Sequence, residues 1–325
     1  MASSSRGLSL GIVVLCLIGL GGVLYYSINQ VESEIPESQV PSQVRQGTVP
    51  YGGSAGMMSG GVIEAGMLHQ AAENGDAAAI TAAIKSGAGV DAMLSSGSKG
   101  GLTPLMCAAL AGKPESINAL FAAGAKVSAR GKDGKTALIY AAGWANPATV
   151  QAVLDGRPNI DERTDDRWTA LMMAASRGEA ASMKTLIDAG ADVNAKNKWG
   201  QTALMAAARA GDAEKVSLLL AAGASVQESD IDGMTALSHA ASSTGATALD
   251  AIKAIIEKKP DVNAPDAQGV SPLMRAADLG DVEKIKVLLA AGANKASKDR
   301  DGRDALTWAT NRSDDAGRAA EVILK

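Results

Sequence analysis

The stretch Thr202–Val226 reads TALMAAARAGDAEKVSLLLAAGASV, and it decides the fold. Alanine, leucine and lysine favour helix, but Gly211 interrupts the stretch and Gly223 lies near its end. Thr202 can cap a first helix through its hydroxyl, and glycine after a helix suits a backbone turn with positive φ. The stretch therefore predicts two short antiparallel helices, the first ended by Gly211 and the second by Gly223.

The same pattern returns along the chain with a nearly constant period. Its signature residue recurs every 33 residues at Thr103, Thr136, Thr169, Thr202 and Thr235. Two further units begin at Ser271 and Asp304, and an earlier one begins at Gly66, which makes eight units over residues 62–325. A helical pair of this size cannot bury its apolar face alone, so the units are expected to stack on one another.

These units resemble the ankyrin repeat. The resemblance is carried by Thr-Pro-Leu at 103–105, by Thr-Ala-Leu at 136, 169, 202 and 235, by the Ala-Ala pairs, and by Gly-Ala-Asp-Val-Asn at 190–194. It implies an all-α solenoid of helix-turn-helix units joined by short β-hairpin-like loops. The histidine of the family pattern remains only at His69, and methionine replaces it in four other units, where we expect it to fill the seam by packing.

The composition agrees with small, closely packed helices. The chain has 325 residues, of which 46% are hydrophobic and only 3% aromatic. Its net charge of −4 offers no basic footprint for nucleic acid. The two cysteines, Cys16 and Cys107, are too few for a disulfide framework or a cysteine-based metal site.

Residues 8–26 predict a membrane-spanning helix. The segment Leu8–Tyr26 contains no charged residue, and as a helix it spans roughly 28 Å, close to the thickness of a bilayer core. Arg6 precedes it and acidic residues follow, which predicts a signal anchor with residues 1–7 in the cytoplasm. The alternative is a cleaved signal peptide, with a weak cleavage candidate at Gly19-Leu20-Gly21.

Residues 27–61 are rich in Glu, Ser, Gln, Pro and Gly and predict a flexible linker. Either reading of the N-terminal segment exports the repeats. We therefore expect a single-pass membrane protein whose repeat domain, residues 62–325, is extracytoplasmic, most simply in a bacterial periplasm.

Candidate catalytic and metal-binding residues are scarce. His69 and His239 lie in separate units without a paired motif, and Cys107 has no accompanying histidine. The two Asp-x-Asp-Gly segments at 230–233 and 299–302 lack the remaining ligands of a calcium loop and suit hairpin turns. We therefore expect no enzymatic activity, cofactor, metal or small-molecule substrate.

The tryptophans indicate a partner-binding surface. The resemblance places the loop tips and the ends of the first helices on the concave face, by which ankyrin arrays bind partners. The side chains predicted to form this surface are Trp144, Trp168, Arg177, Lys198, Trp199, Arg209, Ile231 and Met234. Alternatively, the rings fold back over neighbouring loops as local packing, and Trp308 is expected in the core.

The predicted function is thus a membrane-tethered scaffold that binds a protein partner. The alternative is a soluble inhibitor or escort protein released by cleavage.

Overall fold

The computed structural model describes residues 60–95 and 100–325. Within these residues sixteen α-helices follow one another as eight helix-turn-helix pairs. The pairs are α1 (Gly60–Asn74) and α2 (Ala77–Lys85), α3 (Pro104–Leu110) and α4 (Pro114–Ala122), α5 (Ala137–Trp144) and α6 (Pro147–Asp155), α7 (Ala170–Ser176) and α8 (Ala180–Asp188), α9 (Ala203–Ala210) and α10 (Ala213–Ala221), α11 (Ala236–Ser242) and α12 (Ala248–Glu257), α13 (Pro272–Leu279) and α14 (Val282–Ala290), and α15 (Ala305–Thr310) and α16 (Asp315–Leu324).

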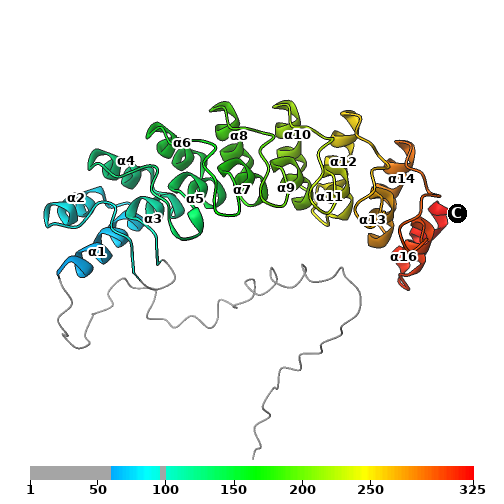
Figure 1. Ribbon diagram of the computed structural model, residues 1–325, viewed down its shortest axis with the longest axis horizontal. Coiled ribbons are helices and arrows are strands. Elements are labelled where there is room, and N and C mark those ends of the chain that lie inside the picture. Colours follow the sequence, from blue (N-terminus) through cyan, green and yellow to red (C-terminus); the bar gives the residue numbers. More distant parts are fainter. Residues whose placement is uncertain (1–59, 96–99) are drawn as a thin grey trace, which may run out of the picture. The chain divides into compact units, whose positions relative to one another are not determined.

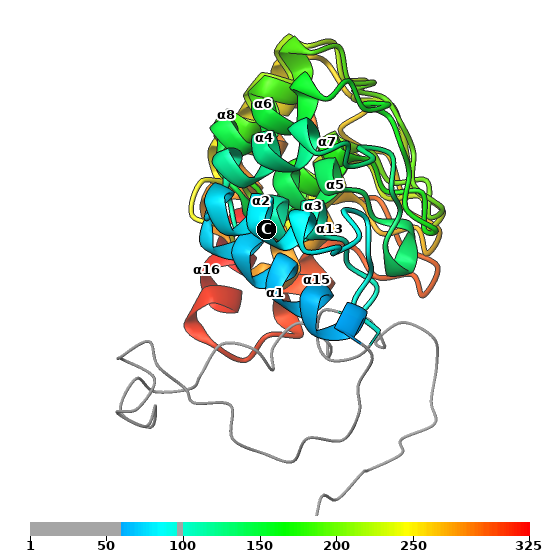
Figure 2. The ribbon, with the colours of Figure 1, turned by 90° about the vertical axis from the view of Figure 1, so that its left-hand side faces the viewer.

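The eight pairs stack in one row, with each helix beside its equivalent in the next pair (Figure 1). The row is curved, and the odd-numbered helices, called inner helices below, lie on its concave side (Figure 1). The even-numbered helices are the outer helices. Loops between the pairs project to the right of the helices in Figure 2, and therefore toward the viewer in Figure 1. The predicted all-α solenoid is confirmed for the described residues.

Side-chain caps fix where most inner helices begin. The hydroxyl oxygens of Thr103, Thr169 and Thr202 each accept a hydrogen bond, 3.3 Å long, from the amide three residues later. Such a cap satisfies one of the four free N–H groups at a helix N-terminus. Thr136 is the exception among the threonines, because its buried hydroxyl has no hydrogen-bond partner.

Glycines separate the helices for two different reasons. Gly211 ends α9 with φ 66°, and Gly223 follows α10 with φ 88°, so both occupy the left-handed region as predicted. Gly178, after α7, does not have a positive φ. A Cβ atom at Gly178 would instead overlap the carbonyl oxygen of Ala142 in the preceding unit. Glycine is needed at this position because two units approach each other closely.

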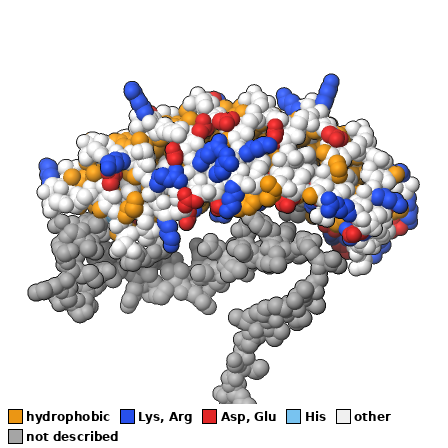
Figure 3. Space-filling model, viewed as in Figure 1, with side chains coloured by type: hydrophobic (Ala, Val, Ile, Leu, Met, Phe, Trp, Pro, Cys, Tyr) orange, Lys and Arg blue, Asp and Glu red, His pale blue; other side chains and the backbone are white. Residues whose placement is uncertain are grey.

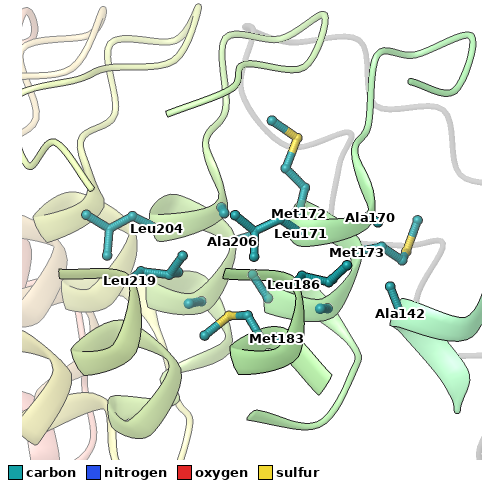
Figure 4. Close-up of a cluster of buried hydrophobic side chains, with 14 of the residues drawn as sticks. Ala142, Ala170, Leu171, Met172, Met173, Met183, Leu186, Leu204, Ala206 and Leu219 are labelled. Atoms are coloured by element: carbon teal, nitrogen blue, oxygen red, sulfur yellow. The ribbon is translucent and has the colours of Figure 1, made fainter. Parts of the chain in front are cut away.

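The core is continuous along the row and is built from small and flexible side chains. Ala207 and Ala208 of α9 are fully buried and let neighbouring inner helices approach. Figure 4 shows Met172 and Met183 with leucines from the neighbouring helices. Four methionines replace the histidine of the repeat pattern, and all four are buried: Met106, Met172, Met205 and Met274. The predicted methionine seam is confirmed. His69, the remaining histidine, lies 3.0 Å from the carbonyl oxygen of Leu102 in the next unit.

Two N-terminal boundaries differ from the prediction. The first inner helix, α1, begins at Gly60, two residues before the predicted start of the repeat domain at residue 62. It also continues through Gly66, where the first unit was predicted to begin. A Cβ at Gly66 would meet nothing within 4 Å, so no close approach requires the helix to end at that point.

The predicted cytoplasmic segment, membrane anchor and most of the linker (residues 1–59) lie outside the described residues. Among the helices that are described, none has the length and apolar character needed to cross a membrane.

Candidate partner-binding surface

Hydrogen bonds join the tips of successive hairpin loops into one row. Six loops contain a five-residue turn in which the first residue donates its N–H to the carbonyl of the fifth: residues 131–135, 164–168, 197–201, 230–234, 266–270 and 299–303. The carbonyl of each third residue then accepts the N–H of the second residue in the next turn. Examples are Lys198 N to Asp166 O at 3.0 Å and Ile231 N to Trp199 O at 2.9 Å. The tips therefore form a continuous, hydrogen-bonded surface.

The Asp-x-Asp-Gly segments are turns, as predicted. One carboxylate oxygen of Asp230 accepts the N–H groups of Asp232 and Met234, and the other lies 2.9 Å from His239 Nε2. Burial raises the pKa of Asp230, but the bonds from His239 and the backbone outweigh burial and lower the pKa below its usual value. Within the described residues no group of three or more His, Cys, Asp or Glu side chains could hold a metal ion.

The same arrangement recurs in the last unit. There Asp299 accepts the indole N–H of Trp308 at 3.0 Å, and the Arg303 guanidinium lies 4.6 Å from the ring centroid. Trp308, predicted in the core, is part-buried and packs against it.

The predicted surface residues fall into two rows. The first row lies in the hairpin turns, which lead into the N-terminal ends of the inner helices. It contains Trp168, Lys198, Trp199, Ile231 and Met234.

The second row lies at the opposite ends of the same helices. Trp144 is the last residue of α5, Arg177 directly follows α7, and Arg209 is in the last turn of α9. A helix of eight residues such as α9 is about 12 Å long, so the predicted single strip is divided into a hairpin row and an inner-helix row.

The exposure of the predicted residues also differs. Ile231 is 65% exposed and Trp144 is 43% exposed, as expected of a docking surface. Arg177, Lys198 and Arg209 are also exposed.

Three predicted residues are more buried than expected. Trp168, Trp199 and Met234 are only part-exposed, and the ring of Trp168 packs against the core. Trp168 and Trp199 are therefore not freely exposed, the packing of Trp168 agrees with the alternative of local packing, and partner binding by either ring stays a prediction.

A chain of aromatic and cationic side chains connects the two rows. Lys135, at the fifth position of its turn, lies 5.9 Å from the ring centroid of Tyr140. The rings of Tyr140 and Trp144 follow at 6.0 Å, and the Arg177 guanidinium lies 5.8 Å from the Trp144 centroid. Each contact is within the range of favourable aromatic or cation–π interactions. Burial, followed by the charges of Asp133 and Cys107, raises the pKa of Tyr140, so its phenol stays neutral and can donate a hydrogen bond.

Lys135 and Tyr140 were not among the residues predicted to form the surface. Tyr140 lies four residues before Trp144, a spacing that brings two side chains together on a helix, and this signal was available.

Lys198 and Trp199 form a second, smaller group in the hairpin row. The Lys198 ammonium lies 4.8 Å from the Trp199 centroid and 2.5 Å from a carboxylate oxygen of Asp166 in the preceding turn. Figure 3 shows Lys and Arg side chains gathered over the middle of this face, with acidic side chains among them. The charge of Lys198 is largely balanced within the surface.

Comparison with protein families agrees with this architecture. A family model that describes three consecutive ankyrin repeats matches the chain in overlapping stretches: residues 68–164, 114–197, 171–266 and 246–319. Together these matches cover most of the chain, which therefore belongs to the ankyrin-repeat family. No curated protein matches the chain. The repeats indicate a scaffold for protein–protein interaction, a class that is typically not enzymatic.

Proposed function

We propose that the chain is a membrane-tethered, extracytoplasmic scaffold that binds a protein partner through units three to six. The main evidence for this binding surface is the exposure of Trp144. Trp144, at the C-terminal end of inner helix α5, is 43% exposed, although Tyr140 and Arg177 already contact its ring. Exposed aromatic and arginine side chains of this kind are enriched among the residues that dominate binding energy at interfaces.

The surface is prepared for binding in two further ways. The hairpin tips are held in register by backbone hydrogen bonds, so little conformational entropy is lost when a partner docks. Arg177 is held over the Trp144 ring and forms no ion pair with any described residue, which leaves its guanidinium available. Ile231 provides an exposed apolar contact in the hairpin row.

The proposed tether rests on the sequence. Residues 8–26 are uncharged and long enough to cross a bilayer, and residues 27–61 have the composition of a linker. A flexible linker of that length has a reach of about 30 Å, which keeps the repeats close to the membrane and lets them turn toward a partner.

The experiment that tests this function compares partner capture by three full-length proteins. Tagged wild type, Trp144→Ala and Val322→Ala are crosslinked in intact membranes and purified, and the bound proteins are quantified by mass spectrometry. Binding of the main captured protein is then measured with purified components. We expect Trp144→Ala to weaken binding by about 30-fold, the loss that corresponds to a hot spot of roughly 2 kcal/mol.

Val322 is the matched control because it is also apolar and is 72% exposed, but lies on the last outer helix. Its replacement should leave capture unchanged. Equal capture by wild type and Trp144→Ala would show that the binding surface does not include the inner-helix row.

A further inference from the structure

Arg167 has a backbone conformation that arginine rarely adopts. Its φ is 64°, in the left-handed region, where the Cβ of an L-residue is crowded. It occupies the fourth position of the turn 164–168, and the corresponding residue is glycine in the other five turns: Gly134, Gly200, Gly233, Gly269 and Gly302. All five glycines also have positive φ. Glycine would therefore fit this position with less strain.

The Arg167 side chain makes no compensating contact with the described part of the chain. It is exposed, and it forms neither a side-chain hydrogen bond nor an ion pair with those residues. Its backbone N–H donates to Thr164 O at 2.8 Å, but the equivalent Gly233 makes the same bond to Asp230 O at 2.9 Å. Nothing within the repeats accounts for arginine in place of glycine.

The carboxylates next to Arg167 in its turn are engaged by other cations, and Arg130 also pairs with Glu162. The neighbouring carboxylates are already paired, Asp165 with Arg130 at 3.3 Å and Asp166 with Lys198 at 2.5 Å. Two further exposed arginines, Arg177 and Arg209, have no carboxylate partner among the described residues. Arg167 in the hairpin row, and Arg177 and Arg209 in the inner-helix row, are thus three exposed guanidinium groups without an ion pair to any described residue.

We propose that Arg167 is a specificity-determining residue that binds a carboxylate of an acidic peptide segment in the partner. This rests on the proposed function and names the chemistry of the partner. The planar guanidinium can donate two parallel hydrogen bonds to one carboxylate, and glycine at the same position can donate none. Arg177 and Arg209 attract further carboxylates of the same segment, while Trp144 contacts its apolar side chains.

The test uses a substitution that separates binding from stability. Arg167→Gly removes the guanidinium and also relieves the left-handed strain, so the variant should be slightly more stable and bind more weakly. The matched control is Arg157→Gly. Arg157 also has a positive φ, 54°, and is exposed, but it follows an outer helix at a place where five other units have glycine and one has Lys259.

The probes are fluorescein-labelled peptides of twelve residues with the repeat Glu-Pro-Leu, and counterparts in which Gln or Lys replaces Glu. Proline keeps all three extended. Dissociation constants for the full-length chain are measured by fluorescence anisotropy at 50 and 200 mM NaCl, and thermal unfolding is measured for each variant.

We expect wild type to bind the Glu peptide more tightly than the Gln and Lys peptides, with weaker binding at the higher salt concentration. Arg167→Gly should raise the dissociation constant for the Glu peptide about tenfold and raise Tm by about 2 °C. Arg157→Gly should raise Tm by a similar amount and leave the dissociation constant unchanged.

Four results would overturn the inference. They are equal binding of the Glu peptide by Arg167→Gly and wild type, equal binding of the Glu and Gln peptides, failure of wild type to bind the Glu peptide, and a lower Tm for Arg167→Gly. The proposed function can survive any of these. If Trp144→Ala weakens binding of the Gln peptide while Arg167→Gly does not, the binding surface stands and only its preference for acidic partners is refuted.

Discussion

Asp299 is the most heavily hydrogen-bonded side chain among the hairpin turns, and its carboxylate is only 1% exposed. Burial raises its pKa, but the backbone and side-chain bonds from Arg303 and the bond from Trp308 outweigh burial and lower the pKa. The folded pKa is thus below the unfolded value of about 3.9, so the unfolded chain binds the proton more readily. The stabilisation is present above about pH 4 and is lost as pH falls through the folded pKa.

Asp299→Asn should therefore lower the free energy of unfolding by roughly 2 kcal/mol at pH 7, because a buried, charge-assisted network is broken. Its stability should also fall less steeply than that of wild type below pH 4. Urea unfolding at pH 7, 5, 4 and 3 measures both effects. Asp188→Asn, on an exposed outer-helix side chain, is the control and should keep the acid dependence of wild type. Parallel curves for Asp299→Asn and wild type would show that this carboxylate does not set the acid stability.

At the scale of the helices, Gly178 and Gly190 flank α8 and are needed for different reasons. A Cβ at Gly178 would overlap the Ala142 carbonyl, whereas a Cβ at Gly190 would meet nothing within 4 Å, and φ there is 89°. Gly178→Ala should force the units apart and cost more than about 2 kcal/mol. Gly190→Ala should cost only about 1 kcal/mol of backbone strain.

Asparagine separates the two causes, because it tolerates the left-handed region better than alanine does. Gly190→Asn should therefore be more stable than Gly190→Ala in urea unfolding. Gly178→Asn should be at least as unstable as Gly178→Ala. If Asn improves on Ala at both positions, backbone conformation and not close approach of the units controls the α7–α8 turn.

At the scale of the whole molecule, the proposed membrane anchor can be tested by fractionation. If residues 8–26 form an uncleaved anchor, the protein should stay in the membrane pellet after high-salt and alkaline washing. Mass spectrometry of the intact protein should then find a chain that begins at Met1 or Ala2. A soluble chain beginning near Gly22 would instead support the alternative of a released inhibitor or escort protein.

Several features of the repeats could be predicted from the sequence because they depend on neighbouring residues. The threonine caps, the positive φ of Gly211 and Gly223, and the alternation of inner and outer helices each follow from patterns within one unit. The 33-residue period extends these local structures into an array. Burial of the methionine seam also follows, since its residues recur at one position in successive units.

The tertiary structure decided what passes between units. The sequence marks Trp144 and Trp168 alike, but one ring is exposed on the inner face and the other packs on the core. It marks Gly178 as a helix end, whereas contact with Ala142 is the reason for glycine there. These properties depend on residues that are about 33 positions apart in the chain and meet only when the units stack, so no pattern within a single unit contains them.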